Sequence, residues 1–367
     1  RRATIFALGI MPYISASIIL QLLQAVIPYF EKLAKEGEEG RKKITQYTRY
    51  GTVGLALVQS VGISLFLQNM NVGGVPVVPI GGIAFKLITM ITLTAGTIFV
   101  MWLGEKISER GIGNGISLII MIGIVARYPT DFLNTWRSLT LGQITPLRLV
   151  LLLLIMVFVI GAVILITQGQ RRIPVQYAKR IVGRKVYGGR SQYIPLRVNT
   201  AGVIPIIFAQ SIMVFPTTIA TFFRVDFLDT FRIWLSPGSW LYISMYALII
   251  IFFTYFYTAI VLNPVDLAEN MRKHGGFIPG IRPGRRTSDY IDGVLSRVTL
   301  PGAVFLAFIA ILPDIMMRRG GLPFMFGGTG LLIVVGVMLD TLQQIETHLL
   351  MRHYDGFMKK GRLRGRR

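Results

Sequence analysis

Side chains that commonly perform catalysis or bind metals are few in this sequence, and their spacing suits neither role. The chain has no cysteine, which excludes thiol chemistry, disulfide bonds and cysteine metal sites. Its three histidines, His274, His348 and His353, lack the spacing of metal ligands, and no apolar segment holds a pair of carboxylates. The glycines between 104 and 115 flank an apolar run and do not follow a strand, so they are a weak signal for a nucleotide. We therefore expect no catalytic residue, no metal and no cofactor, and do not expect an enzyme.

Positive charge is the other chemistry that the sequence offers, and it occurs in a very apolar chain. There are 39 Lys and Arg against 17 Asp and Glu, a net charge of +22, while 53% of the residues are apolar and the mean hydropathy is +0.59. Uncharged apolar runs of about 18–24 residues recur, each long enough to cross a hydrocarbon core of ~30 Å. We predict an all-α polytopic membrane protein with nine spans, at about 5–28, 51–68, 83–103, 112–126, 149–168, 201–223, 240–263, 298–317 and 326–350.

The distribution of Lys and Arg predicts the orientation of these spans. With segment 29–50 inside and the sides alternating, the inner segments hold 29 of the 39 basic residues and the outer segments hold 10. This bias places the first residue outside and the basic tail, 351–367, in the cytoplasm. It also favours the short run at 112–126 as a span, because omitting it would move the basic segment 169–200 outside. Near-alternation around Gly183–Arg184 predicts a β-hairpin within that segment.

Two internal matches indicate a repeat. The stretch "LGIMPYISASII" (8–19) matches "AGVIPIIFAQSI" (201–212) in its glycine, proline and several aliphatic positions, and "GNGISLII" (113–120) matches "GTGLLIVV" (328–335). In the predicted topology the two copies of each pair cross the membrane in opposite directions. This is typical of an inverted repeat, which places a pathway between its halves near the membrane midplane.

Such a pathway belongs to a channel or to a secondary transporter. A coupled transporter usually carries ionisable residues in its spans, and here Asp340 is the only acid well inside one. A channel closed by an apolar constriction fits this composition better. A membrane-anchored RNA-binding protein is a third class, but no loop is long enough for a folded basic domain. The four repeat-bearing spans would line the channel, although periodicity alone does not single out which of their isoleucines face it.

Five stretches together resemble the SecY family, the central subunits of the bacterial protein-translocation channel: "FALGIMPYISASIILQLL", "WLGEKISERGIGNGIS", "QGQRRIPVQYAKR", "VNTAGVIPIIFAQS" and "FIPGIRPGRRT". The resemblance runs from the first residue to the basic tail. It implies a fold of ten helices in two inverted five-helix halves. This chain has nine of those spans, so the family's first helix and most of its plug segment are expected to be absent.

The resemblance also implies three sets of functional residues. The ring that closes the pore falls on Ile10, Ile14, Ile116, Ile120, Ile207 and Ile333. The lateral gate falls on Ser15, Gln59, Asn199 and Phe215. Docking of a motor or a ribosome falls on Arg282, Arg285, Arg286, Arg171, Arg172, Lys179, Arg180, Arg184 and Lys185.

The expected activity follows from the resemblance. The chain would pass unfolded secretory polypeptides across a bacterial inner membrane and release signal or transmembrane helices sideways into lipid. Expected partners are the small subunits SecE and SecG, the motor ATPase SecA, the ribosome with its RNA, and the signal sequences of substrates. The N-terminal half is expected at 1–127 and an outer loop or hinge at 128–148. The C-terminal half is expected at 149–350, with cytoplasmic loops at 169–200 and 264–297.

Overall fold

The computed structural model describes residues 4–72, 75–79, 81–142, 144–177, 180–182, 185–187, 191–222, 239–320 and 328–360. At some of these positions, including 214–222 and 352–360, only the backbone is described.

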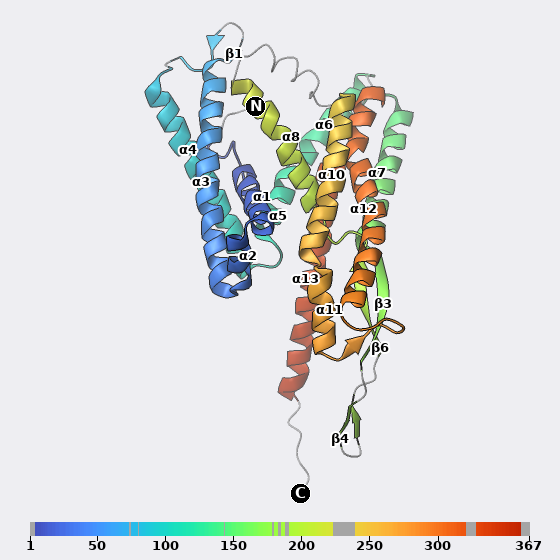
Figure 1. Ribbon diagram of the computed structural model, residues 1–367. Helices are drawn as coiled ribbons and strands as arrows, with labels where there is room; N and C mark the ends of the chain where they lie inside the picture. The colour runs from blue at the N-terminus through green and yellow to red at the C-terminus, as the bar shows by residue number, and fades with distance from the viewer. Residues whose placement is uncertain are drawn as a thin grey trace. The chain divides into compact units, whose positions relative to one another are not determined.

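Helices dominate the described chain (Figure 1), and most are long and apolar enough to cross a membrane. Seven segments meet this test, or eight when the bent pair at the N-terminus is taken as one span. The apolar helix that begins at Ile204 corresponds to the remaining predicted span. The prediction of a polytopic helical membrane protein is therefore confirmed. The spanning helices are α3 (Glu38–Gln68), α4 (Ile83–Arg110), α5 (Gly115–Val125) with α6 (Tyr128–Thr140), α7 (Pro146–Gln168), α10 (Trp240–Val261) with α11 (Pro264–Lys273), α12 (Arg285–Gly320) and α13 (Gly328–Lys360).

The first span departs from the predicted single helix at 5–28. Turns occupy residues 5–10, and α1 runs only over Met11–Val26. It then bends by 99° into α2 (Pro28–Lys35). The bend follows from Pro28, because Ile27 before it adopts an extended conformation (φ −101°, ψ 118°), as residues that precede proline usually do.

Glycine and proline at the start of α1 mark a helix start and do not break a helix. Gly9 has a φ of +57°, in the left-handed region that only glycine adopts easily. Pro12 lies in the first turn, where its missing N–H removes no helical hydrogen bond. The matching stretch has the same geometry, since Gly202 has a φ of +62° and Pro205 lies in the first turn of α8 (Ile204–Phe222). The sequence match is thus also a match of backbone conformation.

The described chain divides into two compact units, and each is described by itself. The first contains residues 1–128 and 336–367, and the second contains 129–335. The helix α13 contributes to both, because the division falls within it.

In the first unit, α3 packs against α1 and lies side by side with α4 (Figure 1). Small residues make this close packing possible, since they recur every fourth position along α3 and are buried. Their hydroxyls bond to carbonyls of the same helix, as Thr52 Oγ1 does to the carbonyl of Thr48 at 2.7 Å. The buried positions are Thr48, Thr52, Ala56, Ser60 and Ser64.

In the second unit, α10 and α12 lie side by side and share an apolar core with α7, α8 and the start of α13 (Figure 1). Below this core, β3 (Gln170–Tyr177) pairs with β6 (Ser191–Arg197) and with β7 (Gly276–Phe277), both antiparallel. Two shorter strands, β4 (Arg180–Val182) and β5 (Lys185–Tyr187), also pair. The predicted hairpin is therefore confirmed. In the first unit, β1 (Asn71–Val72) pairs with β2 (Val75–Pro76).

Candidate pore, gate and docking residues

The isoleucines expected to form the pore ring lie at the starts of their helices. Ile10 is the N-cap of α1, and its carbonyl accepts a hydrogen bond from the N–H of Ile14 at 3.1 Å. Both side chains are buried, at 7% and 8% exposure. Ile207 is half-buried in the first turn of α8, and Ile333 is buried five residues after the start of α13. These side chains are uncharged and make only van der Waals contacts, so the conformation of each helix start determines where they lie.

The start of α5 holds the other two ring candidates. Asn114 is the N-cap, and its Oδ1 accepts hydrogen bonds from the N–H groups of Ile116 (3.1 Å) and Ser117 (3.3 Å). This is the usual action of an N-cap asparagine, which satisfies amide groups that have no partner within the helix. Ile116 and Ile120 are half-buried and lie within the first two turns.

The expected gate residues are divided between the two units. Ser15 on α1 and Gln59 on α3 belong to the first unit, and both are half-buried. Asn199 belongs to the second unit and is 6% exposed, and its Oδ1 has no hydrogen-bond partner among the described residues. Phe215 lies on α8, but its side chain is outside the described residues. A buried amide oxygen without a partner is unfavourable, so Asn199 is the polar gate candidate with an unused hydrogen-bond capacity.

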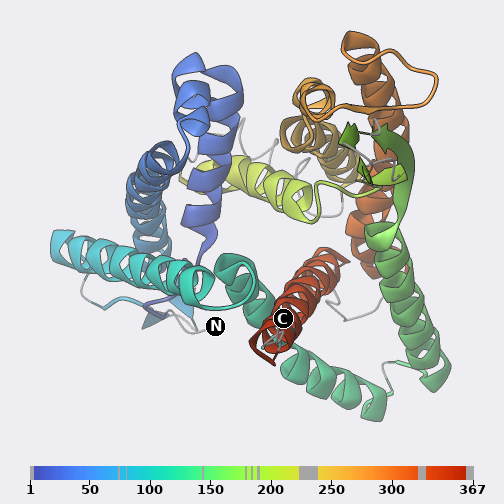
Figure 2. The same cartoon turned by 90° about the horizontal axis from the view of Figure 1, so that it is seen from below.

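The expected docking residues belong to a compact base of the second unit. We call residues 169–177, 191–197 and 264–297 the basal module, because β3, β6, β7, α11 and the start of α12 enclose one apolar cluster there. Seen from below, these elements lie together (Figure 2). On β3 the buried Ile173 and Val175 alternate with exposed neighbours, as expected for a strand with one buried face.

The basal module presents its arginines to solvent. Arg171 and Arg172 are exposed at the start of β3, and Arg282, Arg285 and Arg286 are exposed around the Pro/Gly loop and the start of α12. A hydrogen bond fixes the backbone of the loop, because the hydroxyl of Thr287 on α12 donates to the carbonyl of Arg282 at 2.9 Å. Lys179 and Arg184 lie outside the described residues. Arg180 and Lys185 lie on β4 and β5, where only the backbone is described.

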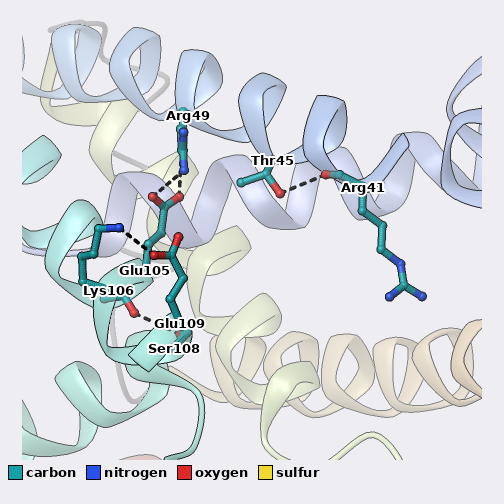
Figure 3. A network of polar contacts seen from close by, with 8 residues as sticks. Arg41, Thr45, Arg49, Glu105, Lys106, Ser108 and Glu109 are labelled. Atoms are coloured by element: carbon teal, nitrogen blue, oxygen red, sulfur yellow. Dashed lines mark hydrogen bonds and ion pairs between the residues drawn. The ribbon is translucent and has the colours of Figure 1, made fainter. Parts of the chain in front are cut away.

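A polar network that the sequence did not predict joins α3 to α4 in the first unit (Figure 3). Arg49 forms a bidentate ion pair with Glu105, with Nε to Oε1 at 3.0 Å and Nη2 to Oε2 at 2.8 Å. Glu105 is largely covered, with 14% of its side chain exposed, whereas 45% of the Arg49 side chain is exposed. Lys106, which directly follows Glu105, pairs with Glu109 at the surface. The bidentate geometry makes the Arg49–Glu105 pair a specific link between two helices.

Within the part of the chain that the structure describes, no group of three or more His, Asp or Glu residues is placed to hold a metal ion. The candidate functional features of the described chain are therefore the apolar helix starts and the exposed arginines of the basal module.

Comparison with known families agrees with this arrangement. The family model for SecY matches residues 4–342. The chain belongs to the SecY family. It is 50% identical over 369 residues to the protein translocase subunit SecY of Escherichia coli (strain K12), covering 99% of this chain and 83% of that protein. It is 46% identical to the subunit of the same name from Aquifex aeolicus (strain VF5), covering 98% of this chain and 84% of that one.

Solved structures show the same SecY fold. One is a SecY protein described for the role of its plug domain in the closed state, with a TM-score of 0.67 at 19% identity, covering 95% of this chain and 83% of that chain. Another is Sec61 in the canine ribosome-channel complex from the endoplasmic reticulum, with a TM-score of 0.60 at 18% identity, covering 94% and 81%. At these identities the likeness shows the fold alone.

The sequence alone did not predict several polar contacts in this SecY-family chain. Arg49 and Glu105 are 56 residues apart, and Gln344 bonds to Gly113 across 231 residues. No local spacing signals such pairs. The one available clue was the dense polar and glycine content of 104–115 between two apolar spans, which indicates a close helix–helix contact.

Proposed function

We propose that this chain is the central subunit of a passive conduit that carries unfolded polypeptides across the membrane and releases apolar helices sideways into lipid. The observation that carries the proposal is membership of the SecY family over nearly the whole chain, with relatives named as protein translocase subunits at up to 50% identity among those compared. The conduit needs no catalytic group, and its driving force comes from partners.

The seal of the conduit is proposed to be the ring of six isoleucines. Aliphatic side chains suit this role because they exclude water and ions yet make no directional bonds that would select one substrate sequence. The burial of Ile10, Ile14 and Ile333 and their places at helix starts support this assignment.

The lateral gate is proposed to involve Ser15, Gln59, Asn199 and Phe215. The Oδ1 of Asn199, which has no hydrogen-bond partner among the described residues, supports a gate that closes by hydrogen bonding. Such bonds are worth roughly 0.6–2 kcal/mol each in membranes. An arriving signal helix, which gains free energy by entering lipid, can offset that amount.

The basal module is proposed to dock the partner that supplies energy. Segment 169–200 carries eight basic residues and no acidic one. The exposed Arg282, Arg285 and Arg286 add charge beside it. Ribosomal RNA is a polyanion that such a surface attracts with strong salt dependence. An acidic face on the motor ATPase SecA would be attracted in the same way. The solved relative in the canine ribosome-channel complex supports the ribosome as one partner.

The remaining parts of the assembly follow the family. We propose that SecE and SecG complete the channel in a bacterial inner membrane, with the first residue outside and the tail in the cytoplasm. The halves are proposed at 1–127 and 149–350, joined by a hinge at 128–148. The lysine and arginine bias toward the inner segments supports this orientation.

Replacement of Ile333 by Asn tests the seal. The polar side chain should hydrate the constriction, so ion leak through the resting channel should rise and substrates with defective signal sequences should be exported. The matched control is Val334→Asn on the same helix, which is also buried at 8% exposure but points about 100° away. An intact seal in Ile333→Asn, or an equal leak in Val334→Asn, would remove Ile333 from the ring.

A further inference from the structure

The start of α5, which carries two of the proposed ring residues, packs against α4. Gly104 on α4 faces Ile116, because a Cβ built on Gly104 would lie 3.0 Å from Ile116 Cγ1. Across the same contact, a Cβ on Gly115 would overlap the carbonyl oxygen of Gly104 and lie 2.7 Å from Ile107 Cβ. The two helices therefore touch through glycines, and Ile116 rests directly on α4.

The hydroxyl of Ser108 stabilises this contact between α4 and α5 through two hydrogen bonds. Its Oγ donates to the carbonyl of Gly104 at 3.0 Å and accepts from the N–H of Gly115 at 2.8 Å. A serine hydroxyl can donate and accept at once. The bond to Gly115 satisfies a first-turn amide of α5 that has no partner in its own helix. Ser108 thus ties the first turn of α5 to the last turns of α4.

The loop between α4 and α5 also forms a hydrogen bond with α13. The N–H of Gly113 donates to Oε1 of Gln344 at 2.9 Å. Gly113 has a φ of +91°, and a Cβ there would lie 3.3 Å from Thr341 Oγ1, one turn before Gln344. The loop therefore lies close to one face of α13, and a glycine is needed both for its conformation and for this close approach.

The hydrogen bond between Gly113 and Gln344 connects two elements of the first unit, the start of α5 and α13. Gln344 belongs to the part of α13 that lies in the first unit, together with Gly113 and α5. Within the first unit, the bond therefore links the loop that begins α5 to the C-terminal part of α13.

We propose that Ser108 and Gln344 are positioning residues of the seal: they hold the start of α5, and with it Ile116 and Ile120, against α4 and the C-terminal part of α13. The inference rests on the proposed ring and adds the polar groups that keep it aligned. Gln344 is the better test residue because it is exposed, so its loss affects the core little.

The experiment measures ion flux and export stringency in the assembled channel in proteoliposomes. Gln344→Leu removes the acceptor of Gly113 and should raise the resting ion flux about fivefold, the effect of losing one hydrogen bond of about 1 kcal/mol from the closed state. Gln344→Glu keeps an acceptor and should stay tight. Amide exchange at Gly113 should quicken in the leucine variant alone, while the melting midpoint stays unchanged. Thr347→Val is the control, since that exposed hydroxyl bonds to the carbonyl of Gln343 within α13.

The outcomes separate this inference from the proposed ring. If Ile120→Asn leaks and Gln344→Leu does not, the positioning role is overturned and the ring stands. If Ile120→Asn is itself tight, Ile120 is removed from the ring, and the positioning role, which acts through the start of α5, fails with it. A leak in Thr347→Val equal to that in Gln344→Leu also overturns the proposal, because the effect would then not depend on the bond to Gly113.

Discussion

Removal of Arg49 should destabilise the protein more than removal of its partner Glu105, and removal of both should restore part of the loss. The reason is unequal exposure within the pair, 45% for the Arg49 side chain and 14% for Glu105. Arg49→Met leaves a carboxylate that is largely cut off from water. Glu105→Met leaves a guanidinium that reaches solvent by a change of rotamer.

The magnitudes follow from the same exposures. Breaking a fully buried ion pair by removing one partner costs about 3–5 kcal/mol, and an exposed pair is worth about 0–1 kcal/mol. Because Glu105 is mostly covered, we expect a cost of about 2 kcal/mol for Arg49→Met. We expect about 1 kcal/mol for Glu105→Met, whose cost is mainly the lost bidentate hydrogen bonds. The double variant has no stranded charge, so it should cost about 1 kcal/mol and be more stable than Arg49→Met alone.

The assay is the order of thermal unfolding midpoints of the four proteins, purified in one detergent at one salt concentration. Lys106→Met is the matched control, because the neighbouring Lys106–Glu109 pair on α4 has 38% and 54% of its side chains exposed and should contribute little. Additive losses, with the double variant less stable than either single one, would falsify the reasoning. So would an equal loss in Lys106→Met.

Two further predictions concern docking and the matched helix starts. Arg282→Glu should impair motor-driven export at low salt and leave membrane insertion of the channel intact, because it reverses a charge on the exposed loop of the basal module. The control is Arg137→Glu on α6, an exposed arginine outside the basal module. Normal export by the Arg282 variant would remove its docking role. Gly202→Ala should lower stability by about 1–2 kcal/mol, because alanine must adopt the φ of +62° although space for its Cβ is open. Gly161→Ala within α7, where a Cβ also meets open space, should instead be neutral or stabilising in the same thermal assay.

Features that depend on composition or local pattern were predictable from the sequence. The apolar runs predicted the spanning helices, since a stretch of about 20 apolar residues has few alternatives to crossing the bilayer. Alternation within 169–200 predicted the strands that the structure pairs as β3 with β6 and β4 with β5. The match between 8–19 and 201–212 predicted equivalent segments, and Gly9 and Gly202 indeed share one backbone conformation.

Contacts between residues that lie far apart in the sequence were not predictable. The pairing of Arg49 with Glu105 and of Gly113 with Gln344 requires the packed helices themselves. The bend after α1 had a local signal in Pro28, but an apolar run continues to that residue and so suggested one unbroken span. Hydropathy predicts which segments can lie in the membrane, but it does not predict the residue at which a helix begins.

The positions of helix starts matter because the proposed seal is built on them. Ile10, Ile116 and Ile207 lie at an N-cap or in a first turn, and Ile333 lies in the second turn of α13. An aliphatic side chain at a helix centre is held by packing on both sides, whereas one at a helix start moves with the cap that defines the start. A seal that must yield to any polypeptide and then close again benefits from this placement. Van der Waals contacts can yield to a substrate, and at the start of α5 the hydrogen bonds of Asn114 and Ser108 hold the helix turn that carries Ile116.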